Sequence, residues 1–271
     1  MRRIAILDSS VCVDVVRGNI PRPDWSRLRE ALTRRFNYFV SPLTFIELIA
    51  GLGKGQDSYY HRNLEALNVL LAPGDNFLPF PGRFVANRVF GQLRTHPGFE
   101  PRDFQNWSAV LLNAANKKQL VDGEVDLAGL SKDGTFGFNF DVIITPHEAG
   151  ITEHVRIYEG IRSRKEKCPS PEQLANAFLV ANGISVTVEN RRTILERIDA
   201  ALTLAAYLCN LAHTSNYKFE NHRGDWVDGQ HLYYLAEPTL YITTMDNPLK
   251  ARINGSPQAN RVVSFEELLR L

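Results

Sequence analysis

Short, uninterrupted hydrophobic runs near both ends of the chain give its clearest structural signal. Residues 4–7 are apolar throughout, and residues 240–243 repeat the pattern close to the other end. Such runs are typical of buried parallel strands, because helices cover both faces of these sheets. Residues 36–40 and 261–264 show weaker strand patterns. The two ends of the chain therefore predict strands of one mainly parallel sheet.

Helix signals follow the strand patterns. After the second one, Ser41 offers a capping hydroxyl and Pro42 suits the first helical position. Residues 58–71 have helical spacing, and residues 189–212 predict one longer helix with a single buried face. Residues 140–145 form a weak strand candidate inside an otherwise helical stretch.

The alternation of strands and helices at both ends predicts an α/β fold. We expect a discontinuous α/β domain that joins residues 1–72 to residues 216–271. Residues 73–215 predict a mostly helical insertion outside the strand order of the sheet. This insertion is the expected surface for selecting substrate, for binding a protein partner or for contacting a second copy of the chain.

Composition narrows the classes of function. The chain has 271 residues, of which 44% are hydrophobic and 23% charged, as is usual for globular proteins. Its formal net charge of +1 excludes nucleic-acid binding through bulk charge, so any such binding needs a local basic patch. Three widely separated cysteines favour a reducing compartment. With no signal-peptide or membrane-spanning pattern, we expect a cytoplasmic protein that does not bind membranes.

Four acidic residues occupy places where a parallel sheet binds ligands. Asp8 and Asp246 each follow a predicted strand, whereas Glu47 and Asp228 lie on predicted helices that can face the same edge. Carboxylates gathered in one place repel one another, and a divalent cation offsets that cost. Mg²⁺ and Mn²⁺ prefer oxygen ligands and keep bound water that can become a nucleophile. The simpler interpretation of an acid such as Asp8 or Asp225 is a helix cap.

Four segments around these acids resemble the motifs of PIN-domain nucleases, in the same order. The first is a strand ending in Leu-Asp-Ser, the second a glutamate in an apolar helix, the third an aspartate opening a helix, and the fourth a strand followed by Thr and Asp. They are residues 4–11, 41–48, 228–236 and 241–246. Ser10 stands where this family usually has asparagine, and the long middle segment lies outside the resemblance.

The resemblance implies a three-layer α/β/α domain with a central, mainly parallel sheet. It also implies cleavage of RNA phosphodiesters by water activated on Mg²⁺ or Mn²⁺. On the matched positions, the metal ligands and catalytic residues would be Asp8, Glu47, Asp228 and Asp246.

Other residues are candidates for supporting roles. Ser9 and Thr244 can orient carboxylates or metal-bound water, although a local bond to the backbone is equally consistent with their positions. Asp225 is a helix cap, a supporting residue or a further ligand. The densest basic run is the candidate contact for RNA phosphates, and it comprises Arg162, Arg164 and Lys165. His213, His222 and His231 fit no metal-binding spacing and are interpreted as solvated.

We therefore expect a metal-dependent endoribonuclease. The first alternative is a catalytically weak RNA-binding or assembly module that retains the fold. The second is a phosphatase that uses Asp8 as a nucleophile, but its Asp-x-Asp signature is missing because Ser10 stands at the second aspartate.

Overall fold

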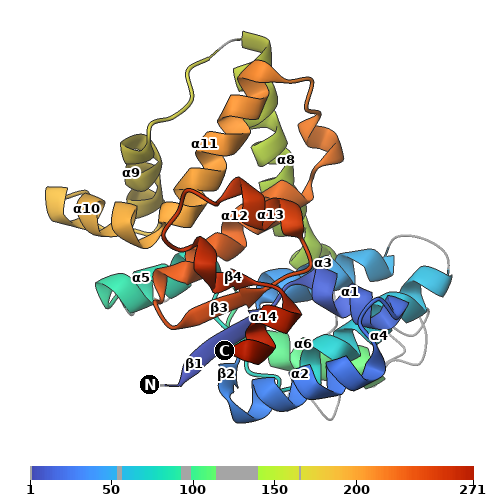
Figure 1. Ribbon diagram of the computed structural model, residues 1–271. Helices are drawn as coiled ribbons and strands as arrows, with labels where there is room; N and C mark the ends of the chain where they lie inside the picture. Colours follow the sequence, from blue (N-terminus) through green and yellow to red (C-terminus); the bar gives the residue numbers. More distant parts are fainter. Residues whose placement is uncertain (1, 54–56, 93–98, 114–139, 165) are drawn as a thin grey trace.

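The strands of the two chain ends form one sheet in the computed structural model, which describes residues 2–53, 57–92, 99–113, 140–164 and 166–271. All strand pairings are parallel and the spatial order is β2-β1-β3-β4 (Figure 1). The strands are β1 (Arg3–Leu7), β2 (Phe36–Tyr38), β3 (Leu240–Thr243) and β4 (Val262–Val263). The central pair aligns Ile4 with Leu240 and Leu7 with Thr243, which confirms the predicted joining of the two ends.

Helices make up most of the described chain. Those before residue 140 are α1 (Ser9–Arg17), α2 (Arg22–Arg34), α3 (Pro42–Gly53), α4 (Asp57–Leu71), α5 (Pro81–Phe90) and α6 (Pro101–Asn113). The later α-helices are α8 (Phe140–Arg164), α9 (Pro171–Ala181), α10 (Val188–Arg197), α11 (Asp199–Thr214), α12 (Gly224–Leu232), α13 (Asn247–Arg252) and α14 (Phe265–Arg270). Short 3-10 helices are η1 (Phe219–Asn221), η2 (Tyr233–Ala236) and η3 (Ala259–Arg261). No described helix is both long and apolar enough to cross a membrane.

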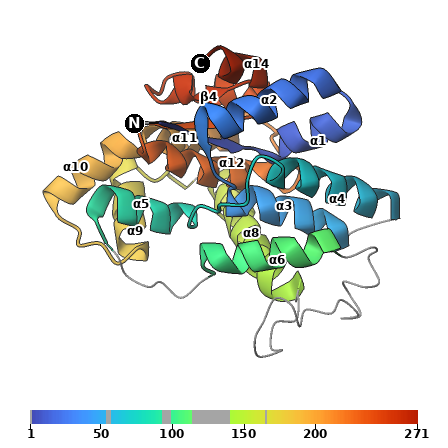
Figure 2. The ribbon, with the colours of Figure 1, turned by 90° about the horizontal axis from the view of Figure 1, so that it is seen from below.

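Buried side chains on the two sheet faces belong to two separate hydrophobic clusters. Alternate residues of a strand point to opposite faces, so Ile4 and Ile6 join one cluster while Ala5 and Leu7 join the other. The first cluster includes residues of α5 and of α8 to α12, and the second includes residues of α1 to α4, α6 and α14. In Figure 2, α1, α2 and α14 lie on the side opposite α5 and α9. Helices therefore cover both faces, as an α/β fold requires.

The middle segment packs directly against this sheet. In its described part it contributes helices, and α8 contacts α3, α11 and α12. A parallel bridge joins its Phe77 to Val40. Tyr158 of α8 and Phe178 of α9 share a buried cluster with Ile4 and Ile6. Phe104 of α6 belongs to the other cluster, so the middle segment packs on both faces of the sheet.

Two secondary-structure predictions are wrong. Residues 140–145 begin helix α8, because a short apolar run alone does not distinguish a strand from a buried helical segment. The helix predicted at residues 189–212 is broken at Ile198 into α10 and α11. The side chain of Gln258 occupies the break: its Nε2 donates to the carbonyl of Arg197 at 2.7 Å, and its Oε1 accepts from the amide of Ala200 at 3.0 Å.

Replacing Gln258 by leucine should destabilise the fold. The substitution leaves buried backbone groups at both helix ends without partners, and we expect the free energy of unfolding to fall by about 2–4 kcal/mol. Urea unfolding of wild type and Gln258→Leu measures this difference. Gln105→Leu is the control, because its side-chain bond to Asp75 is exposed and its loss should cost less than about 0.5 kcal/mol. Equal losses in the two variants would contradict the proposed role of Gln258.

Candidate active site

The first part of the site lies where the strand order reverses. From β1 the chain continues to β2 on one side, whereas β3 pairs with β1 on the other. In open parallel sheets, such a switch point is where ligands bind, beyond the carboxyl ends of the strands. Asp8 follows β1 there, and its amide donates to the carbonyl of Thr243 at 2.9 Å. Asp8 and the Thr244–Asp246 loop are thereby placed side by side.

Two hydroxyl groups fix the Asp8 carboxylate. Ser10 Oγ donates to Asp8 Oδ2 at 2.5 Å, and Thr244 Oγ1 donates to the same oxygen at 2.9 Å. The same hydroxyls accept from the amides of Met245 and Asp246, at 3.0 Å and 2.9 Å. Thr244 therefore orients the Asp8 carboxylate and also bonds the nearby backbone, so both roles left open by the sequence are present. Ser10 makes the same two kinds of hydrogen bond as Thr244. Its position two residues after Asp8 is the sequence signal for this role.

Asp8 and Asp246 also occupy helix-capping positions, but only one of them caps. Asp8 is the N-cap residue of α1, yet its side chain makes no capping hydrogen bond. Asp246 is the N-cap residue of α13, and its Oδ1 accepts from the amide of Leu249 at 3.2 Å. The simple helix-cap interpretation of Asp8 is therefore wrong, since its carboxylate faces the site.

Glu47 brings a second carboxylate from helix α3. Its side chain is partly buried, and among the described residues its Oε2 has no hydrogen-bond partner. The pKa of Glu47 is raised to about 8, first by burial and then by the charge of Asp8, while a hydrogen bond from Ser9 opposes the shift. Ser9 thus forms a hydrogen bond with Glu47, whereas Thr244 forms one with Asp8.

Asp228 on α12 completes the group. Burial raises its pKa well above the usual range, and the charges of Asp8, Asp246, Glu47 and Asp225 add to the effect in that order. The charges of the other three predicted acids therefore all act on Asp228. Within the described part of the chain, no lysine or arginine forms an ion pair with any of them.

This excess of negative charge bears on whether a metal fits. Carboxylate oxygens are the ligands that Mg²⁺ and Mn²⁺ prefer, and the partnerless Oε2 of Glu47 is a buried donor atom. Among the described residues, however, no three acidic, histidine or cysteine side chains form a preassembled metal-binding group. The type and charge of the donors fit a hard divalent cation.

His231 belongs to the site, contrary to the interpretation that it is solvated. It is buried, with 1% of its surface exposed. Its Nε2 lies 2.9 Å from Ser41 Oγ and 3.2 Å from Thr44 Oγ1, and its Nδ1 lies 4.0 Å from Asp8 Oδ1. Burial lowers the pKa of His231, and the charge of Asp8 opposes this. Its position three residues after Asp228 places both on one side of α12, a signal present in the sequence.

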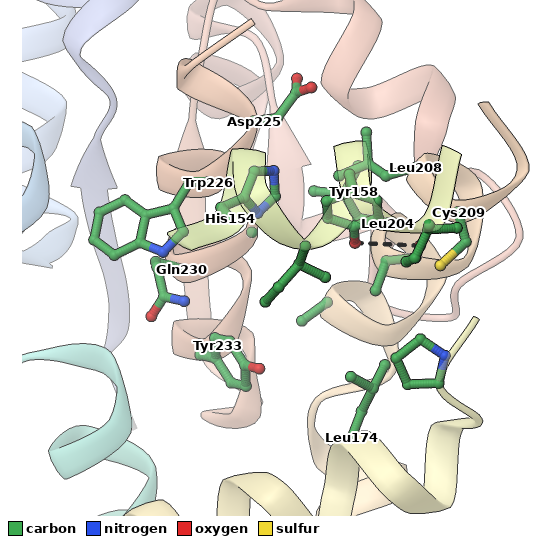
Figure 3. Close-up of a pocket in the computed structure, with 16 residues that line it drawn as sticks. His154, Tyr158, Leu174, Leu204, Leu208, Cys209, Asp225, Trp226, Gln230 and Tyr233 are labelled. Atoms are coloured by element: carbon green, nitrogen blue, oxygen red, sulfur yellow. Dashed lines mark hydrogen bonds between the residues drawn. The ribbon is translucent and has the colours of Figure 1, made fainter. Parts of the chain in front are cut away.

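Asp225 lies outside the acidic group. It is not a helix cap, because Arg223 is the N-cap residue of α12. Its carboxylate accepts from Arg252 Nη1 and from the Tyr217 hydroxyl, both at 2.7 Å. Figure 3 shows Asp225 beside a separate, mainly apolar cavity of about 220 Å³, with Trp226 and Tyr233 of the same chain segment. The Arg252 cation pairs with this carboxylate, and the charge of Asp225 contributes least of the four charges that raise the pKa of Asp228.

The predicted RNA contacts lie far from the acids. Helix α8 borders Glu47 through His147 and Ile151, in a cleft of about 200 Å³. Arg162 is fifteen residues beyond His147, or about 22 Å along the helix, at the far end of α8 in Figure 1. There Arg162 pairs with Glu159 and Arg164 with Glu166. Lys165 lies outside the described residues.

Comparisons with protein-family models, with curated proteins and with solved structures found no match. The evidence for a nuclease is therefore confined to the four motifs and to the grouping of their carboxylates.

Proposed function

We propose that this protein is a metal-dependent endoribonuclease with a PIN-like, three-layer fold. The observation that supports this most is that the charge of Asp8 acts on Glu47, and the charges of Asp8, Glu47 and Asp246 act on Asp228, at the switch point of a parallel sheet. A protein gains no stability from burying such a group, because each carboxylate raises the cost of ionising the others. A bound divalent cation would offset the repulsion between the carboxylates and could activate water for attack on a phosphodiester.

The residues of the site would have two kinds of role, metal binding and positioning of the metal ligands. The four carboxylates would hold Mg²⁺ or Mn²⁺, which supplies an activated water molecule and offsets charge on the phosphate. Ser10 and Thr244 fix one oxygen of Asp8 and leave Oδ1 directed elsewhere. His231 Nδ1 lies 4.0 Å from Asp8 Oδ1, and its Nε2 contacts Ser41, which precedes α3, and Thr44 of α3. The two hydroxyls therefore orient Asp8 before any ligand binds.

Cleavage of RNA tests this proposal. The purified chain is incubated with labelled single-stranded and structured RNAs in Mg²⁺ or Mn²⁺, with a chelator in parallel. Cleavage that depends on the metal supports a nuclease.

A catalytically weak RNA-binding module is the second candidate. The lack of a preassembled metal-binding group among the described residues favours it. RNA binding without cleavage under any of these conditions would select this candidate over the nuclease.

Metal binding should also stabilise the protein. Millimolar Mg²⁺ or Mn²⁺ at about a hundredfold excess over its Kd should raise the free energy of unfolding by about 3 kcal/mol. Thermal unfolding with and without the metal measures the effect. Asp75→Asn, which removes an exposed carboxylate outside the site, should respond like wild type, whereas Glu47→Gln should lose most of the stabilisation. Equal stabilisation of both variants would show that the metal binds elsewhere.

A further inference from the structure

Two clefts flank the acidic group, and each contains basic side chains. Glu47 borders the cleft between α3, α8 and the start of α12, which also contains Arg223. Asp246 borders a second cleft of about 330 Å³, formed around α13 and α14, which contains Lys250 and Arg270. The two clefts border different members of the acidic group, so cations lie near both Glu47 and Asp246.

In each cleft a glutamate outside the acidic group pairs with the cation. Arg223 pairs with Glu148 of α8, and the two side chains are 46% and 29% exposed. Lys250 Nζ lies 2.6 Å from both oxygens of Glu267, and both side chains are 41% exposed. Ion pairs this exposed contribute little stability. A phosphate group can therefore replace the glutamate as partner at small cost.

We propose that an RNA strand crosses the acidic group from one cleft to the other, with Arg223 contacting a phosphate on the Glu47 side and Lys250 and Arg270 contacting phosphates on the Asp246 side. The inference rests on the proposed function, since it names the path of its substrate. A polyanion does not approach four carboxylates unless cations beside them hold its backbone. Arg162 and Arg164, at the far end of α8, are too distant to do so.

Binding of a short, unstructured, fluorescently labelled RNA tests the path. Fluorescence anisotropy is measured with Mg²⁺ over a series of salt concentrations, and the parent is Asp8→Asn so that the RNA stays intact. We expect Arg223→Gln and Lys250→Gln each to weaken binding about threefold to tenfold and to reduce the salt slope by about one. Arg270→Gln replaces Lys250→Gln if thermal unfolding shows that the latter does not fold.

Two further variants separate a phosphate contact from a structural role. Arg192→Gln is the matched control, because Arg192 also pairs with a glutamate but lies on α10, away from the clefts, and it should bind RNA like the parent. Glu148→Gln removes the competitor for Arg223, so it should tighten binding severalfold. A merely structural Arg223–Glu148 pair would predict weaker binding or no change.

The outcomes are distinguishable. If Arg223→Gln and Lys250→Gln bind like the parent while wild type cleaves RNA, the path is overturned and the proposed function stands. The path is also overturned if Arg164→Gln weakens binding more than both. If wild type neither binds nor cleaves RNA, the proposed function fails and the path fails with it.

Discussion

Asp8→Asn should reduce RNA cleavage by about a thousandfold, the scale of losing one charge-stabilising group in a catalytic site. Asp8 is central to the electrostatics, because its charge raises the pKa of both Glu47 and Asp228. The amide keeps the shape of the carboxylate but lacks the charge that a divalent cation needs. The loss should therefore lie in kcat, with RNA affinity largely retained.

The fold of this variant should be preserved. The amide oxygen can still accept from Ser10 and Thr244, which hold the carboxylate in wild type. Removing one of the mutually repelling charges should even stabilise the metal-free protein. Thermal unfolding should thus show an equal or higher midpoint for Asp8→Asn.

The measurement compares cleavage of the same labelled RNA by wild type, Asp8→Asn and Asp75→Asn, purified identically. Asp75→Asn removes an exposed carboxylate and should cleave like wild type. Chelator should abolish activity in every sample. Equal cleavage by wild type and Asp8→Asn would show that the activity comes from a contaminant.

The metal-free protein should become less stable as the pH rises from about 4.5 to about 8, and Glu47 should cause much of this loss. Its pKa is about 8 in the fold, against an ordinary value of 4.5 for a glutamate carboxyl. Below pH 4.5 the carboxyl is protonated in both states and contributes nothing. Between the two values only the unfolded chain releases the proton, so each pH unit costs up to about 1.4 kcal/mol.

Urea unfolding of wild type and Glu47→Gln across this pH range measures the effect. The amide cannot ionise, so Glu47→Gln should equal wild type near pH 4.5 and exceed its free energy of unfolding by a few kcal/mol at pH 8. The control is Glu65→Gln, an exposed residue of α4 that should follow the wild-type pH dependence. Parallel curves for wild type and Glu47→Gln would mean that Glu47 is ionised in the fold.

Adding Mg²⁺ at pH 8 should reverse the difference between these proteins. The cation binds the ionised carboxylate, so it stabilises wild type more than Glu47→Gln.

Local sequence patterns determined the sheet and the location of the acids. Short, largely apolar runs mark β1 and β3, because helices cover both faces of a parallel sheet and bury these strands on both sides. Asp8 and Asp246 follow those runs directly, so the parallel pairing of the strands suffices to bring them to one edge. The Ser41-Pro42 signal likewise fixed the start of α3 and, with it, the position of Glu47.

Contacts between residues far apart in the sequence determined the helix break, the partner of Asp225 and the burial of His231, which local patterns do not predict. Gln258 breaks the predicted helix at Ile198 from sixty residues away, Arg252 compensates Asp225, and packing against α3 buries His231. Packing also decides which basic residues lie near the acidic group. The dense basic run at the end of α8 lies far from the acids, whereas the isolated Arg223 and Lys250 lie in the clefts that border them. Periodicity reports which face of a helix is buried, but the partner of a charged or polar side chain depends on how the elements pack.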